Sequence, residues 1–205
     1  MISFLLVDDH GVVREGVQRL LSAHFDAEIF EAADVESGLV LFQDKRPDVV
    51  LLDLNLAGAG GLEMLRRMLA IDAAAKVVIF SMHSEPVYAV RAIKAGARGY
   101  VSKSAPVDEL IAGIRKVADG GQYIDREVAS RIAVSQLTAD DPMQQLSLRE
   151  VEILRLLGQG KSLTAISEAL GMAYKTVANT CTNMKAKLGV ERTADLIRLA
   201  IEMKP

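Results

Sequence analysis

The sequence predicts two domains of different fold class: an α/β domain with a doubly wound, five-stranded parallel sheet over residues 1–120, and a smaller all-α domain of four helices over residues 146–205. Three observations predict this division. Short apolar runs alternate with helical patterns in the first part, strand patterns are missing from residue 146 onwards, and the stretch that separates the two parts is polar and contains Pro142.

Five segments of the first part have the composition of strands. Three are almost unbroken aliphatic runs, as expected for strands buried on both faces of a parallel sheet: Ile2–Val7, Val49–Leu52 and Val77–Phe80. Glu28–Ala32 resembles a more exposed strand, and Gly99–Val101 a short one. Because helical patterns lie between these segments, the repeated strand–helix order predicts a parallel sheet with right-handed crossovers.

The helices between these strands are predicted from apolar residues at helical spacing, such as Val13, Val17 and Leu21. Pro106 stands in the first turn of the last helix of the domain, which runs to about Ala118.

A glycine pair, Gly120-Gly121, interrupts the pattern, and residues 121–145 are predicted to be a linker. This linker contains one short helix, Asp125–Leu137, with Val128 and Ile132 on one face.

Composition and charge narrow the class of protein. Half of the residues are hydrophobic and a quarter are charged, which is typical of a globular chain. No apolar run approaches the about 18–20 residues of a membrane span, no secretory leader is recognisable, and the single cysteine, Cys181, excludes an intramolecular disulfide. We therefore expect a cytoplasmic protein without membrane contacts. Residues 1–119 contain 13 basic and 17 acidic residues, whereas residues 146–205 contain 9 basic and 6 acidic residues. The second domain is therefore better suited than the first to bind a polyanion.

Polar residues follow the predicted strands at their carboxyl ends. These residues are Asp8, Asp9, Asp53, Ser81 and Lys103. Taken singly, each fits a helix cap, a turn or a solvated side chain. A parallel sheet would bring all five to one edge, where neighbouring carboxylates need a cation. Hard oxygen ligands suit Mg²⁺, and a lysine and a hydroxyl beside them suit a phosphoryl group.

Residues 1–120 resemble the receiver domain of two-component response regulators, a flavodoxin-like fold. The resemblance rests on Val7–His10, Leu51–Leu56 followed by Gly60–Glu63, Ser81, Ala95–Tyr100 and Lys103. It implies that Asp53 accepts a phosphoryl group from a sensor histidine kinase. It also implies that Asp9, Asp53 and the backbone carbonyl of Asn55 hold Mg²⁺, with Asp8 assisting through water.

The resemblance further implies a switch. Lys103 and Mg²⁺ would neutralise the charge of the transferred group, Ser81 would bind a phosphoryl oxygen and move inward, and Tyr100 would follow it. The face around the fourth helix, fifth strand and fifth helix would report the change. Receivers often have proline after this lysine, and here Ser104 follows it, which leaves the isomer of the Lys103–Ser104 bond open.

Two histidines flank this predicted site, His10 and His83. His83 lies two residues beyond Ser81, where it could tune the loss of phosphate, but we interpret both histidines as ordinary loop residues.

The second domain contains four predicted helices, Ser147–Leu157, Leu163–Leu170, Lys175–Leu188 and Thr193–Met203. The second and third, joined at Gly171-Met172, have the pattern of a helix-turn-helix, although two helices with a tight turn also fit a plain dimerisation module. The third helix has an apolar stripe formed by Val177, Cys181, Met184 and Leu188. Cys181 is therefore interpreted as a core residue.

Residues 146–203 resemble the DNA-binding domain of the LuxR (NarL/FixJ) class. The resemblance rests on Leu146–Leu154, Gly160–Ser162, Ile166, Leu170, Lys175–Val177 and Lys187–Val190. It implies that the third helix enters the major groove of double-stranded DNA. The expected contacts come from its outward residues, Lys175, Thr176, Ala178, Asn179, Thr182 and Lys185.

The fourth helix of this class supports dimerisation. Here its apolar stripe would be Leu196, Ile197, Ala200 and Ile201. The recognition helix departs from the family at two positions, with Ala178 in place of a common lysine and Thr180 in place of a common histidine. The loss of a cation weakens the expected DNA affinity.

Together these features predict a response regulator rather than an enzyme: phosphorylation controls a homodimer that binds two promoter half-sites about one helical turn apart. A regulator that acts through protein contacts is one alternative. A phosphatase-like enzyme with Asp53 as nucleophile is another, but Asn55 stands where its acid would be expected.

Overall fold

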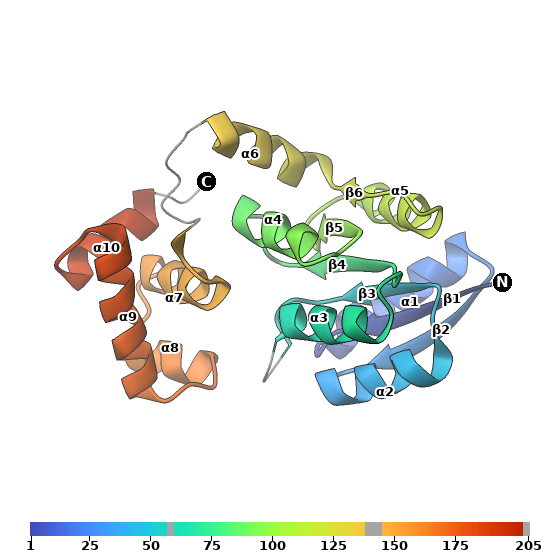
Figure 1. Cartoon of the computed structure of the whole chain (residues 1–205), viewed down its shortest axis with the longest axis horizontal. Helices are drawn as coiled ribbons and strands as arrows, with labels where there is room; N and C mark the ends of the chain where they lie inside the picture. Colours follow the sequence, from blue (N-terminus) through green and yellow to red (C-terminus); the bar gives the residue numbers. More distant parts are fainter. Residues whose placement is uncertain (57–59, 138–144, 203–205) are drawn as a thin grey trace. The chain divides into compact units, whose positions relative to one another are not determined.

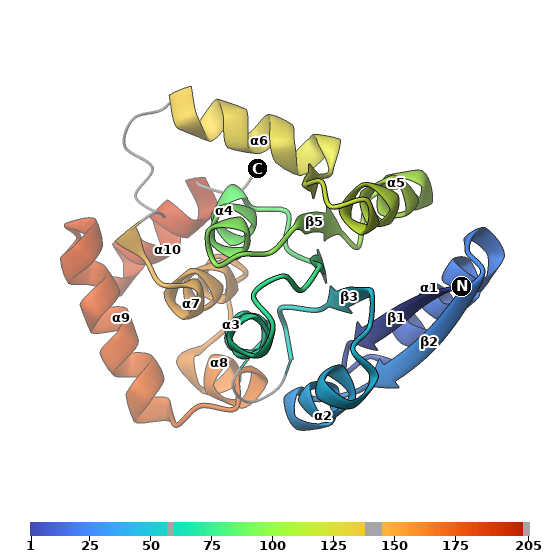
Figure 2. The ribbon, with the colours of Figure 1, turned by 45° about the vertical axis from the view of Figure 1, so that its right-hand side comes forward.

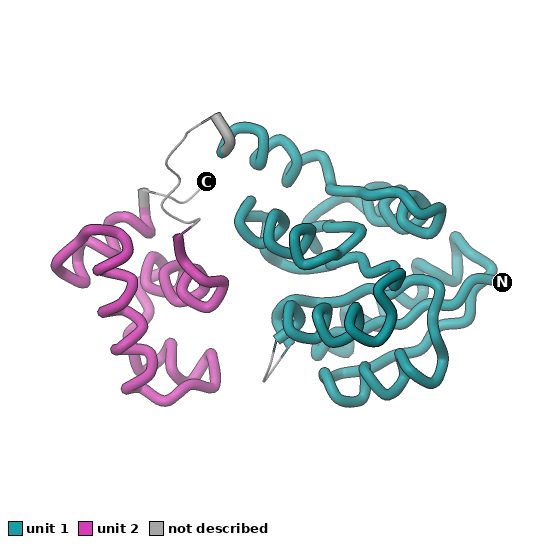
Figure 3. Tube along the Cα trace, in the orientation of Figure 1, with its two compact units in different colours: residues 1–137 teal, residues 138–205 magenta. Residues whose placement is uncertain are grey.

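The computed structural model describes residues 1–56, 60–137 and 145–202, without the side chains of residues 136, 137 and 202. The chain divides into two compact units, residues 1–137 and residues 138–205 (Figure 3). None of the described helices combines the length and the apolar composition that crossing a bilayer requires.

Unit 1 alternates strands and helices (Figure 1). Its elements are β1 (Ile2–Val7), α1 (Gly11–His24), β2 (Ala27–Ala32), α2 (Val35–Lys45), β3 (Val49–Leu52), α3 (Gly61–Ile71), β4 (Val77–Ser81), α4 (Pro86–Lys94), β5 (Gly99–Ser102), α5 (Val107–Ala118), β6 (Tyr123–Ile124) and α6 (Arg126–Leu137). The strands form one parallel sheet in the order β2-β1-β3-β4-β5-β6. This confirms the doubly wound class, and it places the ends of β1 and β3 side by side at the point where the strand order reverses.

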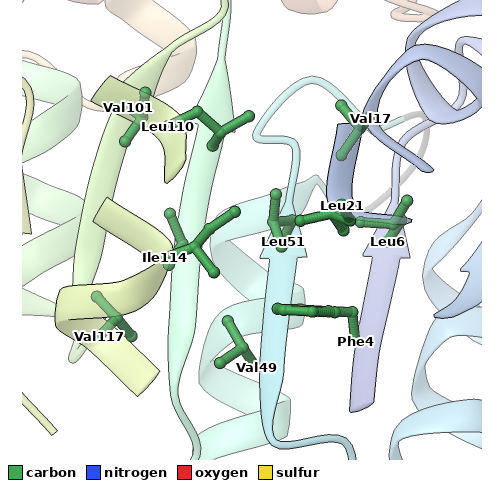
Figure 4. Packing of buried hydrophobic residues seen from close by; sticks show 11 residues of the cluster. Phe4, Leu6, Val17, Leu21, Val49, Leu51, Val101, Leu110, Ile114 and Val117 are labelled. Atoms are coloured by element: carbon green, nitrogen blue, oxygen red, sulfur yellow. The ribbon is translucent and has the colours of Figure 1, made fainter. Parts of the chain in front are cut away.

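Aliphatic side chains make the core on both faces of this sheet. Helices α1 and α5 cover one face, where Leu21 and Ile114 pack against alternate residues of the strands such as Phe4 and Leu51 (Figure 4). On the opposite face Gly38 of α2 approaches β1 so closely that an added Cβ would lie 3.3 Å from the side chain of Val7. Because both faces are covered, the central strand β3 is apolar throughout, and polar side chains gather at and beyond the strand ends.

The sheet has six strands rather than the predicted five. The extra strand, β6, is two residues long and pairs with β5 through the register Gly99↔Tyr123. It forms because Gly120, with φ of 84°, ends α5 in the left-handed region and turns the chain back along the sheet. A two-residue strand is too short to show an alternating pattern, so the sequence did not reveal it.

The described part of the predicted linker is therefore structured. Residues 121–137 belong to unit 1, where they form β6 and α6 and where α6 contacts α4. Residues 138–144 of that segment lie outside the described residues.

Unit 2 consists of α7 (Leu148–Gly158), α8 (Leu163–Ala169), α9 (Tyr174–Leu188) and α10 (Thr193–Glu202). The four predicted helices are confirmed, and their ends agree with the prediction or differ from it by one residue, except that Met203 lies outside the described residues. A capping box begins α7, in which the Ser147 side chain accepts from the Glu150 backbone and the Glu150 side chain accepts from the Ser147 backbone. Gly189, with φ of 67°, ends α9.

The apolar stripe predicted for dimerisation is only partly available. Leu196 and Ala200 are buried, at 0% and 9% exposed. Helix α10 lies so close to α7 that an added Cβ on Gly158 would be 2.9 Å from the Cβ of Ala200. The prediction is wrong for these two residues, because they supply the core of unit 2. Ile197 is half-buried and Ile201 is exposed, so these two remain open to a partner.

Candidate functional site

The adjacent ends of β1 and β3 bring two acidic residues together. Val7 pairs with Leu52 in the sheet, and the backbone N–H of Asp53 donates to the carbonyl of Val7 at 2.9 Å. Asp8 and Asp53, the next residues along each strand, therefore lie side by side. Both are buried, at 5% and 2% exposed, and two carboxylates in such a place require compensating charge.

Lys103 supplies part of that charge. Its backbone N–H donates to the carbonyl of Ser81 at 2.7 Å, which holds the residue at the end of β5 against β4. Its Nζ lies 2.6 Å from Oδ2 of Asp8 and 2.7 Å from Oδ2 of Asp53. One ammonium thus bridges two carboxylates inside the protein, and the three strand ends meet at one edge as the sequence predicts. The Lys103–Ser104 peptide bond is trans.

Two further residues lie beside this pair. Asp9 is exposed, and its Oδ1 is 2.6 Å from Nδ1 of His10. Oxygen atoms of Asp8, Asp9 and Asp53 and a ring nitrogen of His10 all lie within 4.8 Å of one another. Three carboxylates at this spacing fit the hard oxygen ligands that Mg²⁺ takes. The imidazole of His10 lies beside the cluster, while the residue is exposed in the loop after β1, which is compatible with its interpretation as a loop residue.

Ser81, at the end of β4, and Tyr100, in β5, are buried. Both side chains are 0% exposed, and the Tyr100 hydroxyl donates to the backbone carbonyl of His83 at 2.7 Å. Burial, reinforced by the charge of Glu85, raises the pKa of Tyr100 well above its ordinary value, so the phenol is neutral and can donate. The ring of Tyr100 therefore points inward in this structure.

His83 is also buried, at 4% exposed, which contradicts its interpretation as an ordinary loop residue. Its Nε2 lies 2.7 Å from Oδ1 of Asn55, and its ring stacks on Tyr88 with centroids 3.9 Å apart. Its backbone N–H donates to Oγ of Ser81 at 3.4 Å. The side chain links the loop after β3 to the loop after β4. The only sequence signal for it was its position two residues beyond Ser81.

A glycine supports the loop that carries Asp53. The backbone N–H of Gly61 donates to the carbonyl of Leu54 at 3.0 Å. An added Cβ at Gly61 would lie 2.0 Å from the carbonyl oxygen of Asp53, which no side chain can accept. The first turn of α3 therefore lies directly against the backbone of Asp53.

In unit 2, α9 presents two faces. Val177, Cys181 and Met184 are buried and Leu188 is half-buried, as the apolar stripe predicts. Burial raises the pKa of the Cys181 thiol, which supports its interpretation as a core residue.

The opposite face of α9 contains the residues expected to meet DNA. Lys175, Thr176, Asn179 and Thr182 are exposed, whereas Ala178 and Lys185 are half-buried. Tyr174, the first residue of α9, is not among the predicted contacts and is 55% exposed.

Two contacts position this helix. Nζ of Lys187 lies 2.7 and 2.8 Å from the two carboxylate oxygens of Glu150 on α7. Burial opposes the ionisation of Glu150, but hydrogen bonds from Lys187 and Ser147 outweigh it and hold the pKa of Glu150 below its ordinary value. Arg149 donates through Nη2 to the carbonyl of Leu170 at 2.5 Å, and so fastens the turn between α8 and α9 to α7.

Comparison with known proteins agrees with both units. Residues 4–115 match the family described as "Response regulator receiver domain", and residues 144–200 match "Bacterial regulatory proteins, luxR family". The chain is 35% identical over 205 residues to response regulator UvrY of Escherichia coli strain K12, with 98% of this chain and 94% of that one covered. It is 34% identical to the methanol utilization control regulatory protein MoxX of Paracoccus denitrificans, with 96% and 89% covered.

A solved structure is similar as well. The crystal structure of a LuxR-family two-component response regulator from Aurantimonas sp. SI85-9A1 is 37% identical, with a TM-score of 0.65 over 67% of this chain and 99% of that chain. The chain therefore belongs to the two-component response regulators, in which a receiver domain is joined to a LuxR-type DNA-binding domain and regulates transcription.

Proposed function

We propose that Asp53 is the phosphoacceptor of this response regulator and that a sensor histidine kinase is the donor. The observation that carries this proposal is the contact between Lys103 Nζ and Oδ2 of Asp53, at 2.7 Å, inside a cluster with Asp8 and Asp9. The carboxylate of Asp53 can attack phosphorus, and the cation beside it can stabilise the charge of an incoming phosphoryl group.

The chemistry is an in-line phosphoryl transfer. An oxygen of Asp53 attacks phosphorus, the bond between phosphorus and the histidine nitrogen of the donor breaks, and an acyl phosphate forms. Lys103 lies between Asp8 and Asp53, so it can follow the phosphoryl oxygens without losing Asp8 as a partner. Ser81, buried at the end of β4, would donate to a phosphoryl oxygen.

Mg²⁺ is the metal that this cluster suits. Asp8, Asp9, Asp53 and the backbone carbonyl of Asn55 would hold it, and when bound it would neutralise charge on the phosphoryl oxygens. Asn55 already folds toward this site, because its backbone N–H donates to Oδ1 of Asp53 at 3.2 Å.

For DNA binding by unit 2, we propose that α9 enters the major groove of promoter DNA. The contacts would come from its outward residues, Lys175, Thr176, Ala178, Asn179, Thr182 and Lys185. The four exposed members of this set support the proposal, as does the firm attachment of α9 through Glu150 and Arg149. Phosphorylation would act by changing the positions of the Ser81 and Tyr100 side chains and by promoting a homodimer that spans two half-sites.

Incubation with acetyl phosphate and Mg²⁺ tests the phosphoacceptor. We expect intact-mass spectrometry to show one added phosphoryl group on the natural chain and none on Asp53→Asn. The matched control is Asp44→Asn, because Asp44 is exposed on α2. Labelling of Asp53→Asn to the same extent as the natural chain would refute the assignment.

DNA binding is tested by titrating salt against a promoter duplex. Contacts between cationic side chains and DNA phosphates make the affinity for DNA fall steeply as the salt concentration rises. For a regulator that acts through protein contacts instead, the affinity for DNA would change little with salt. We expect the steep response, and we expect phosphorylation to increase affinity for paired half-sites in the natural chain and not in Asp53→Asn.

A further inference from the structure

Asp125 is a buried carboxylate that the chemistry above does not use. It lies between β6 and α6 and is 1% exposed. Its two oxygens have different partners: Oδ2 accepts the backbone N–H of Ser102 at 2.8 Å, and Oδ1 accepts the backbone N–H of Val128 at 2.9 Å. One side chain thus joins the residue that precedes Lys103 to the first turn of α6.

This link is constrained at each end. A carboxylate inside a protein is costly unless its oxygens accept hydrogen bonds, so neither donor can move away freely. The backbone N–H of Asp125 also donates to the carbonyl of Tyr100 at 3.0 Å, which fixes its main chain to β5. A displacement of the end of β5 must therefore either move the start of α6 or break a buried hydrogen bond.

A second contact attaches α6 to the other loop of the pocket. Nη1 of Arg131 donates to Oγ of Ser84 at 3.1 Å, and Ser84 follows His83 in the chain. Nη2 of the same side chain binds Glu127 at 2.7 Å, one turn earlier on α6, which orients the guanidinium. Helix α6 lies beside α4 in two views (Figures 1 and 2). Through Asp125 and Arg131, α6 is therefore linked to Ser102 at the end of β5, next to Lys103, and to Ser84 in the segment that follows Ser81.

We propose that Asp125 is a positioning residue that couples Lys103 to α6, the last element of unit 1 before the DNA-binding unit in the chain. The coupling rests on the proposed function only for the event that triggers it in the natural protein. On phosphorylation, the phosphoryl group replaces the Asp53 carboxylate as a partner of Lys103. A shift of Lys103 displaces Ser102, and Asp125 transmits that displacement to the N-cap of α6. The coupling is reciprocal, so the state of α6 also biases the pocket.

A double-mutant cycle on the full, unphosphorylated chain without added metal tests this coupling. Asp53→Asn removes the negative charge that Lys103 Nζ contacts, and Asp125→Ser keeps an N-cap for α6 but is too short to reach Ser102 as well. The readout is hydrogen exchange of the α6 amides between residues 129 and 135. We expect Asp53→Asn to change their exchange rates by about twofold or more in the natural background, and by clearly less beside Asp125→Ser.

Asp34→Ser is the matched control. Asp34 is the N-cap of α2, where Oδ1 accepts the Ser37 N–H at 2.9 Å, and it is exposed. It lies at the same edge of the sheet as the pocket, two residues after Ala32, whose carbonyl accepts the N–H of Asp8, but its bond is to α2 and not to β5 or α6. In that background the response of α6 to Asp53→Asn should equal the natural one. Should α6 lose its protection in Asp125→Ser, Asp125→Asn replaces it, since it keeps the length and one acceptor.

Equal responses in the natural and Asp125-substituted backgrounds, or no response of α6 in the natural chain, would overturn the coupling. Neither result bears on the phosphoacceptor, because no phosphoryl group is present in the experiment. The mass measurement on Asp53→Asn decides that question separately.

Discussion

The acidic pocket of unit 1 and the outward face of α9 in unit 2 are built in different ways. The pocket joins Asp8, Asp53 and Lys103, which come from three strands and meet only because the sheet is in register. The face of α9 comes from successive turns of one helix and requires only helical periodicity. Changes in the pocket should therefore disturb the fold and the chemistry together, whereas changes on the helix face should alter binding alone.

Lys103→Met should produce the largest effect, because it leaves the buried carboxylates of Asp8 and Asp53 without their shared cation. We expect a loss of about 3–5 kcal/mol in the stability of unit 1 in metal-free buffer, measured by urea unfolding. Added Mg²⁺ should restore more stability to this variant than to the natural chain. Lys94→Met, at an exposed position, is the control, and equal losses in the two variants would show that the pocket does not depend on the charge of Lys103.

Gly61→Ala should have the next largest effect, because the new Cβ would lie 2.0 Å from the carbonyl oxygen of Asp53. The backbone must shift, at a cost of about 1–3 kcal/mol, and labelling by acetyl phosphate should slow. Gly16 is helical and has nothing within 4 Å of an added Cβ. Gly16→Ala should therefore leave stability unchanged or raise it by up to about 1 kcal/mol. A harmless Gly61→Ala would show that the pocket tolerates movement of Asp53.

Glu150→Gln tests the support of α9 rather than its surface, with an expected loss of about 1 kcal/mol in unit 2 near neutral pH. The folded-state pKa of Glu150 is lowered from the ordinary 4.5, so its ionised form stabilises the fold above that pH. This contribution is lost as pH falls below 4.5 through the lowered value. The stability difference between the natural chain and Glu150→Gln should therefore shrink in acid. Exposed Glu168→Gln should show no such trend.

Ala178→Lys should have the smallest effect on the fold and a measurable one on DNA. It returns a cation to the half-buried position where the family commonly has lysine, and it should steepen the dependence of log affinity on log salt by about 1. Ala194→Lys, exposed on α10, adds the same charge elsewhere and sharpens the test. If both variants change the slope equally, the outward face of α9 is no special contact surface.

The pocket could be predicted to a large extent because parallel strands end at one edge, so Asp8, Asp53 and Lys103 were expected together and are found together. His83 could not be predicted in the same way. Its burial arises from stacking on Tyr88 and from a hydrogen bond to Asn55, and nothing in local periodicity reports either contact.

The same reason explains the errors at Leu196 and Ala200. Apolar spacing shows that a face of α10 is buried, but it does not show whether α7 or a second chain covers that face. Likewise, Asp125 looked like an ordinary start of a linker helix, and only the tertiary structure shows its second bond to Ser102.

Local sequence patterns were sufficient to predict the two fold classes, the order of the helices and of strands β1 to β5, and the acidic and basic residues at the strand ends. These follow from the periodicity of apolar residues and from helix-ending glycines, which act over a few residues. The tertiary structure alone decided the sixth strand, the attachment of α6 to unit 1 and the burial of His83 and Asp125. Those features depend on which distant segments supply hydrogen-bond partners to buried polar groups, and that choice is made only when the whole unit packs.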